Sequence, residues 1–179
     1  MNDWNVVVSV FQDGFTRTLQ TLGTLGKVDR TPYYNILLVK TDDPIGLLQA
    51  LELKTEEVPA LYDAISRVAP AMERFSFASA DDFKEKAAPI LKAWSKRLAG
   101  QSFHARLHRR GGRQELPSPD IEKFIDDAVI AATRVAGKTA TVSFDDPDAV
   151  IAVDTVDDQA GLALWTRDDL ARHRLLRPE

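Results

Sequence analysis

The chain has 179 residues, of which 44% are hydrophobic and 28% charged; it contains no cysteine, and its formal net charge is −4. This composition is typical of a globular protein; it excludes disulfide scaffolds, cysteine-ligated metal sites and thiol nucleophiles, and the net charge argues against a nucleic-acid-binding chain. Because there is no run of 18 apolar residues and no basic stretch before the first apolar segment, we expect a cytoplasmic chain with no membrane partner.

Strand and helix patterns alternate in the first half of the chain. Apolar, β-branched runs predict strands, and apolar residues at helical spacing predict helices. The expected strand, helix, strand, pair of helices and closing strand cover residues 4–11, 15–25, 33–40, 45–68 and 72–77. This alternation predicts a small ferredoxin-like α+β domain over residues 1–79.

The second half opens with a long helix expected over residues 80–98. Pro89 lies inside this expected helix and removes one of its backbone hydrogen bonds. We therefore expect a kink or two short helices meeting near Ala88. The remaining expected elements are a strand, a helix and two strands over residues 102–109, 118–135, 149–155 and 161–165. They form a second α+β domain, expected over residues 80–179.

The charges are unevenly distributed along this second half. Residues 94–113 contain six basic and no acidic side chains, whereas residues 114–165 contain three basic and eleven acidic ones. A positive block flanked by acidic segments creates a focused field that would steer a polyanion to one face. The local charge therefore reverses the impression given by the net charge.

The segment around Gly111 and Gly112 is the main candidate binding site. Four arginines on or just after the expected strand would offer forked guanidinium donors to phosphate oxygens; they are Arg106, Arg109, Arg110 and Arg113. The alternative is a solvated basic edge strand, since cations on an edge also deter aggregation.

Two histidines share this strand. His104 and His108 are four residues apart, which on a strand is roughly 13 Å, too far for one shared metal ion. We therefore expect them to be exposed donors beside the arginines rather than metal ligands.

Paired aspartates occur throughout the chain. They fall at expected helix starts, turns and exposed helix faces, where aspartate is favoured for local hydrogen bonding. No dinucleotide, phosphate-loop, zinc-protease or serine-hydrolase motif is present. The sequence thus predicts no catalytic residue, no metal site and no cofactor.

The second half resembles a THUMP domain, the RNA-binding module of thiouridine synthases, RNA methyltransferases and pseudouridine synthases. The resemblance lies in SFHARLHRRGG, LPSPDIEKFIDDAVIAATR and VSFDDPDAVIAVDTVDDQAGLAL, which match the basic first strand, the following helix and the final strand pair. The first half is similar to the ferredoxin-like domain that accompanies THUMP, notably in NVVVSVFQDGF and ISRVAPAMERF. Such a pair without a catalytic domain resembles the free-standing THUMP adaptor family of tRNA cytidine acetylation.

This resemblance implies a non-enzymatic protein that docks tRNA near its acceptor stem and 3′ end. The protein would then present the tRNA to a separate modifying enzyme, which by this resemblance is a cytidine acetyltransferase. The implied RNA-binding residues combine the basic strand with its neighbours; they are Lys96, Arg97, His104, Arg106, His108, Arg109, Arg110 and Arg113.

Two alternatives stay open at this point. The chain itself could be a stand-alone RNA-modifying enzyme, which would bind S-adenosylmethionine, ATP or acetyl-coenzyme A. It could also be a protein interaction scaffold that has lost RNA binding. In that case its contact surface would be the acidic helix face of Asp120, Glu122, Asp126 and Asp127.

Overall fold

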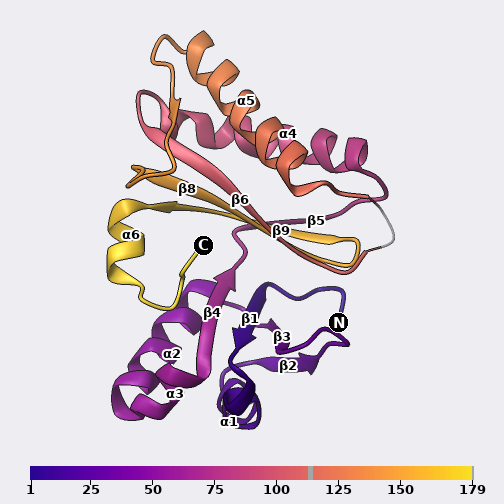
Figure 1. Ribbon diagram of the computed structural model, residues 1–179, viewed down its shortest axis with the longest axis vertical. Coiled ribbons are helices and arrows are strands. Elements are labelled where there is room, and N and C mark those ends of the chain that lie inside the picture. Colours follow the sequence, from indigo (N-terminus) through magenta and orange to yellow (C-terminus); the bar gives the residue numbers. More distant parts are fainter. Residues whose placement is uncertain (113–114, 179) are drawn as a thin grey trace. The chain divides into compact units, whose positions relative to one another are not determined.

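The computed structural model describes residues 1–112 and 115–178 (Figure 1). The chain folds into two compact units. The first comprises Met1–Met72 together with the tail from Leu170, and the second comprises Glu73–Asp169. The domain boundary that the sequence analysis expects between residues 79 and 80 stays a prediction.

The first unit has the ferredoxin-like order of elements. Its sheet has the strand order β2-β3-β1-β4, and every neighbouring pair is antiparallel. The elements are β1 (Val6–Val10), η1 (Gln12–Gly14), α1 (Phe15–Leu22), β2 (Lys27–Arg30), β3 (Ile36–Lys40), α2 (Pro44–Glu57), α3 (Pro59–Ala64) and β4 (Ile65–Pro70). This βαββαβ arrangement confirms the predicted fold class.

Two strands of this unit differ from the prediction. The expected helix through Val68 ends at Ala64, and Ile65–Pro70 is β4, paired with β1. Spacing alone did not distinguish the two structures, because β-branched Ile65 and Val68 fit a buried strand as well as a helix stripe. Strand β2 was missed because its four residues are charged or half-buried at a sheet edge.

The tail after residue 170 is part of the first unit. The Val68 N–H donates to the Leu175 carbonyl at 2.8 Å, and the Leu175 side chain is fully buried. The buried His173 has its Nδ1 2.8 Å from Oε2 of Glu52, which explains a histidine whose role the sequence leaves open. The tail therefore contributes packing and a strand-like hydrogen bond at the outer edge of β4.

The second unit has a five-stranded mixed sheet with two long helices on one face (Figure 1). The strand order is β5-β9-β8-β6-β7, and β6 is parallel to both of its neighbours. The elements are β5 (Glu73–Ser76), α4 (Ala80–Leu98), β6 (Ser102–Arg110), α5 (Ser118–Val135), β7 (Thr141–Val142), β8 (Ala149–Val156), β9 (Gln159–Thr166) and the start of α6 (Arg167–Arg172), whose last three residues belong to the first unit. The strand expected at residues 72–77 is β5 of this sheet rather than of the first one.

The core of the second unit follows the alternation of its strands. Phe103, Ala105 and Leu107 of β6 face α4 and α5 and are buried with Phe83 and Ile125 in one hydrophobic cluster. Residues at even positions of β6 consequently lie on the opposite face of the sheet. The side chains of β6 therefore alternate between the helix-covered face and the opposite face of the sheet.

Helix α4 passes through Pro89 as one helix rather than two short ones. The Pro89 side chain is exposed, so the carbonyl that loses its partner lies on the solvent side, where water can bind it. Ser79 caps the helix by accepting a hydrogen bond from the Asp82 N–H at 3.0 Å. No helix in the described ranges is long and apolar enough to cross a membrane.

Candidate nucleic-acid interface

The middle of β6 presents Arg106 and His108 on the sheet face away from the helices. Both side chains are partly exposed. Arg106 Nε is buried and has no hydrogen-bond partner within the described residues. Any contact of Arg106 with a ligand would therefore involve the rest of the guanidinium group.

The C-terminal end of β6 holds Arg109 and Arg110. Arg109 Nε donates to the Gly111 carbonyl at 3.1 Å, and its Nη2 donates to the Gly112 carbonyl at 3.4 Å. Both glycines have positive φ, 64° and 95°, so Arg109 fastens a loop whose backbone favours glycine. This arginine has a structural role that the sequence did not predict.

Arg110 is less exposed than Arg109 but makes fewer hydrogen bonds with the described residues. Its Nη1 donates to the Arg109 carbonyl at 3.2 Å, which leaves most of its five N–H donors without a partner in the described part of the chain. However, the Asp157 N–H donates to the Arg110 carbonyl at 2.9 Å, so the acidic β8–β9 turn with Asp157 and Asp158 lies beside it. These carboxylates reduce the positive potential at this end of the strand.

His104 is not the exposed donor that the sequence predicted. Its side chain is 2% exposed, and its Nδ1 lies 3.1 Å from the Ser143 carbonyl. The ring of Phe144 covers it, with 5.5 Å between the ring centroids. The alternation of β6 is as expected, but the loop after β7 lies over this position. Arg113 lies outside the described residues.

Lys96 and Arg97 lie at the other end of β6. They belong to the last turn of α4, which leads through Gly100 into the first residue of β6. Because β6 has nine residues, about 26 Å of strand separates Ser102 from Arg110. The predicted RNA-binding residues therefore lie in two groups, one at each end of β6.

Two cations that the sequence did not single out lie at the same end as Lys96 and Arg97. The Gly100 N–H donates to the Lys138 carbonyl at 2.8 Å, which brings the C-terminal ends of α4 and α5 together, and Arg134 is in the last turn of α5. We call Lys96, Arg97, Arg134 and Lys138 the helix-end cluster. All four are exposed, and none of their side chains forms an ion pair or hydrogen bond with another described residue.

Beyond Phe103, where the pairing with β7 ends, the outer edge of β6 is covered by two carboxylates of α5. The Leu107 N–H donates to Glu122 Oε1 at 2.8 Å, and the Ala105 N–H donates to Asp126 Oδ1 at 3.2 Å. The pKa of Asp126 is raised to about 6, mainly by burial and to a smaller extent by the negative charge of Glu122, against the lowering effect of the Ala105 hydrogen bond. Two of the four residues of the acidic helix face, Glu122 and Asp126, thus form hydrogen bonds within the second unit.

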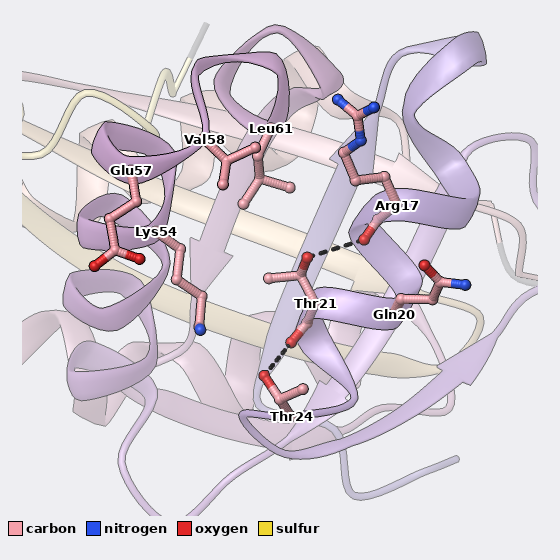
Figure 2. Close-up of a pocket in the computed structure, with 8 residues that line it drawn as sticks. All are labelled: Arg17, Gln20, Thr21, Thr24, Lys54, Glu57, Val58 and Leu61. Carbon is pink, nitrogen blue, oxygen red and sulfur yellow. Dashed lines mark hydrogen bonds between the residues drawn. The ribbon is translucent and has the colours of Figure 1, made fainter.

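A cavity of about 290 Å³ lies in the first unit between α1 and the α2–α3 segment (Figure 2). Lys54 reaches from α2 into the space between the helices (Figure 2). The hydroxyl groups of Thr21 and Thr24 donate to the carbonyls of Arg17 and Thr21 at 3.0 and 2.7 Å. Both hydroxyls thus donate to carbonyls of α1, and the charged residues that line the cavity are Arg17, Lys54 and Glu57.

Among the paired aspartates and their neighbours, Asp43 forms the expected local hydrogen bond, whereas Asp126 and Asp148 accept from backbone N–H groups that are distant in sequence. Asp43 Oδ1 accepts from the Gly46 N–H at 2.8 Å at the start of α2, and Asp148 Oδ2 accepts from the Ser102 N–H at 2.9 Å. Within residues 1–112 and 115–178, no three His, Asp or Glu side chains are grouped to hold a metal ion.

Comparison with solved structures shows the same fold in proteins of low sequence identity. PH1313 from Pyrococcus horikoshii Ot3 matches 90% of this chain with 14% identity and a TM-score of 0.59, over 54% of its own length. TrmN from Thermus thermophilus matches 89% with 18% identity and a TM-score of 0.54, over 44% of its length. A 4-thiouridine synthetase, solved with RNA and ATP, matches 91% with 13% identity and a TM-score of 0.54, over 42% of its length.

This chain thus spans about half the length of these proteins or less. No curated protein sequence matches it. The THUMP domain family matches residues 77–164, from the residue after β5 to near the end of β9. The matched range includes α4, β6, α5 and β8, together with the whole helix-end cluster. Residues 77–164 of this chain are therefore a THUMP domain, an RNA-binding module.

Proposed function

We propose that this chain is a non-enzymatic RNA-binding protein that docks tRNA and presents it to a separate tRNA-modifying enzyme. The observation that carries the proposal is the THUMP domain at residues 77–164, with exposed cations at both ends of its strand β6. Cations that neutralise phosphates supply most of the affinity in binding that does not depend on sequence. Side chains cannot read the narrow major groove of A-form RNA, so recognition would be by shape and backbone contacts.

The adaptor role and the cytidine acetyltransferase partner rest on the resemblance of the two-domain arrangement to the free-standing THUMP adaptors. The RNA-bound 4-thiouridine synthetase supports the connection between this fold and RNA, although that protein is an enzyme. Delivery of tRNA requires contact with the modifying enzyme as well as with RNA. We therefore expect the chain to co-purify with a tRNA-modifying enzyme and to increase that enzyme's rate on tRNA.

RNA binding is tested by filter binding of the purified protein to total tRNA at several salt concentrations. We expect micromolar affinity at low salt that weakens linearly in logarithmic units as the salt concentration rises. The negative control is a tRNA-sized polyanion without ribose or bases, such as heparin, which should compete less well than tRNA. Absence of tRNA binding at low salt, with the protein folded, would contradict the proposal.

The enzyme alternative is tested by thermal unfolding in the presence of S-adenosylmethionine, ATP or acetyl-coenzyme A. A bound cofactor stabilises the folded state in proportion to the logarithm of its concentration over its dissociation constant. We expect none of the three to move the thermal midpoint. A rise that increases with the concentration of one of them would instead assign a catalytic function to the chain.

A further inference from the structure

Strand β2 forms one edge of the sheet in the first unit (Figure 1). At the opposite edge the tail covers β4, because the Val68 N–H donates to the Leu175 carbonyl at 2.8 Å. Within the described residues, β3 is the strand that pairs with β2, and no other segment bonds to the β2 backbone. An uncovered edge presents N–H and C=O groups that can pair with a strand of another chain.

The hydrogen bonds of β3 show which of its residues face β2. On the β1 side, the Val10 N–H donates to the Asn35 carbonyl at 3.0 Å. On the β2 side, the Thr31 hydroxyl donates to the Ile36 carbonyl at 2.9 Å. In an antiparallel sheet the backbone groups of successive residues point to alternate sides of the strand. Odd-numbered residues of β3 therefore bond to β1, and even-numbered residues bond to β2.

The free backbone groups of β2 follow from this alternation. Lys27 and Asp29 lie opposite even-numbered residues of β3, so their N–H and C=O groups are bound to that strand. Val28 and Arg30 direct theirs to the open edge. Neither residue has another partner for these groups in the part of the chain that the structure describes. The edge thus offers two residues with the spacing that a neighbouring strand requires.

The side chains along this edge are self-complementary in charge. Lys27, Val28 and Asp29 are positive, apolar and negative in turn. If two copies pair antiparallel about a two-fold axis at Val28, the two valines exchange a pair of backbone hydrogen bonds. Each Lys27 then lies opposite Asp29 of the second copy, in the type of pair whose side chains are closest.

Other registers of the same pairing bring like charges together. An axis at Lys27 places two lysines opposite each other, and an axis at Asp29 places two aspartates opposite each other. An axis at Arg30 does the same for two arginines. Like charges directly opposite on neighbouring strands are destabilising. The charges therefore favour the register centred on Val28.

The charges already present in the sheet favour a negative neighbour. Lys27 lies directly opposite Lys40 in the β2–β3 pair, and within the described ranges neither ammonium group has an ion-pair partner. Asp29 Oδ2 is 3.5 Å from the Met1 ammonium group, and the Asp29 side chain is still 39% exposed. Asp29 of a second copy would lie on the side of Lys27 away from Lys40 and would offset the repulsion between the two lysines.

We propose that two copies of this chain associate by antiparallel pairing of their β2 strands, in the register that places Lys27 opposite Asp29. The two four-stranded sheets of the first units then join into one continuous antiparallel sheet. Charged residues on an edge usually deter such pairing, but here the order of their signs makes two copies attract. Because β2 has four residues, the dimer is weak and reversible, as small interfaces are. The inference goes beyond the proposed function and does not depend on RNA binding.

The test is sedimentation equilibrium of the nuclease-treated chain from about 5 μM to 1 mM protein, the range for a weak dimer. Lys27→Asp and Asp29→Lys each place like charges opposite one another in a self-pair, and Lys27→Asp/Asp29→Lys restores opposite charges. The matched controls, Lys92→Asp and Glu56→Lys, make the same charge changes on exposed residues of α4 and α2. Val28→Pro removes the outward N–H and leaves the bonds to β3 in place.

We expect the wild type to convert from monomer to dimer within this range, and to dimerise less at about 0.5 M salt. Each single charge variant changes two symmetric pairs, so its dimer dissociation constant should rise by about 5-fold to 50-fold. An equimolar mixture of the two single variants should form mixed dimers with wild-type affinity, since one copy then carries two aspartates and the other two lysines. The double variant and both controls should also dimerise like the wild type.

Two further results should follow from the backbone pairing. Val28→Pro should stay monomeric, because the proline lacks the N–H that the second copy binds. In the wild type, hydrogen exchange measured by NMR should show the Val28 N–H protected only at the concentrations at which the dimer forms.

A wild-type chain that stays monomeric at about 1 mM would overturn the proposal. Equal dimerisation of the wild type and both single charge variants would also overturn it, because another surface would then hold the copies together. A mixture of the single variants that dimerises no better than either one alone would contradict the register. Thermal midpoints identify any variant that fails to fold, and the salt dependence and Val28 exchange of the wild type then decide without that variant.

Discussion

The cationic side chains at the two ends of β6 differ in how they are bound within the protein. At the C-terminal end, Arg109 is bound to the Gly111 and Gly112 carbonyls, and the acidic β8–β9 turn lies beside Arg110. At the N-terminal end, the helix-end cluster combines cations from two helices, and none of these side chains has a partner among the described residues. The density of arginine in the sequence therefore does not indicate which cations are available to a ligand.

Reversing charges at the helix-end cluster tests this difference most strongly. In Lys96→Glu/Arg97→Glu/Arg134→Glu, three unpaired cations become repulsive to phosphate, so we expect tRNA affinity to fall by about 100-fold or more at low salt. Filter binding measures the change. The thermal midpoint should fall only slightly, because all three side chains are exposed, although last-turn cations also favour the helix dipole. A large loss of stability would show that these cations are structural.

Reversal at the opposite end should have a smaller effect. We expect Arg110→Glu to weaken tRNA binding by about threefold to tenfold, because one cation near Asp157 and Asp158 contributes less than three unpaired ones. The same filter-binding assay compares the two ends directly. If Arg110→Glu weakens binding more than the triple variant does, the ranking of the two ends is wrong.

The variant Arg109→Ala tests whether Arg109 stabilises the glycine loop or contacts RNA directly. Loss of the hydrogen bonds to the Gly111 and Gly112 carbonyls should lower the free energy of unfolding by about 1 kcal/mol. Chemical denaturation measures this change. Affinity for tRNA should fall no more than in Arg110→Glu. Unchanged stability together with a large loss of affinity would instead make Arg109 a direct RNA contact.

The smallest expected effect concerns Asp126 and pH. Its pKa is raised to about 6 in the folded protein, so the folded state binds this proton more tightly than the unfolded chain does. The resulting stabilisation is full below about pH 4 and is lost as the pH rises through about 6. Asp126→Asn keeps an oxygen that can accept from the Ala105 N–H. We expect it to remove this part of the pH dependence in thermal unfolding between about pH 4 and 7, and an unchanged profile would contradict the assignment.

The parts of the fold that the sequence predicted are those with long, regular patterns. The alternation of Phe103, Ala105 and Leu107 is sufficient to place β6 with one face in the core, and the stripes of α4 and α5 are equally regular. Short elements were not predictable in this way. Strand β4 follows α3 without a turn residue, so one apolar series continues through the change from helix to strand.

The candidate site was predictable in composition but not in arrangement. Arg134 and Lys138 join Lys96 and Arg97 through a tertiary hydrogen bond between Gly100 and Lys138, which no local pattern encodes. The burial of His104 depends on Phe144, forty residues later in the sequence. Two helices with cations in their last turns are a general signal that could have suggested the helix-end cluster.

The most direct test is the salt dependence of tRNA binding by the wild type and by the Lys96→Glu/Arg97→Glu/Arg134→Glu variant. We expect the wild type to bind tRNA with a steep salt slope, and the variant to bind far more weakly with a slope reduced by about two or more. Equal affinities and slopes for the two proteins would contradict the claim that this THUMP domain holds tRNA through the ends of α4 and α5.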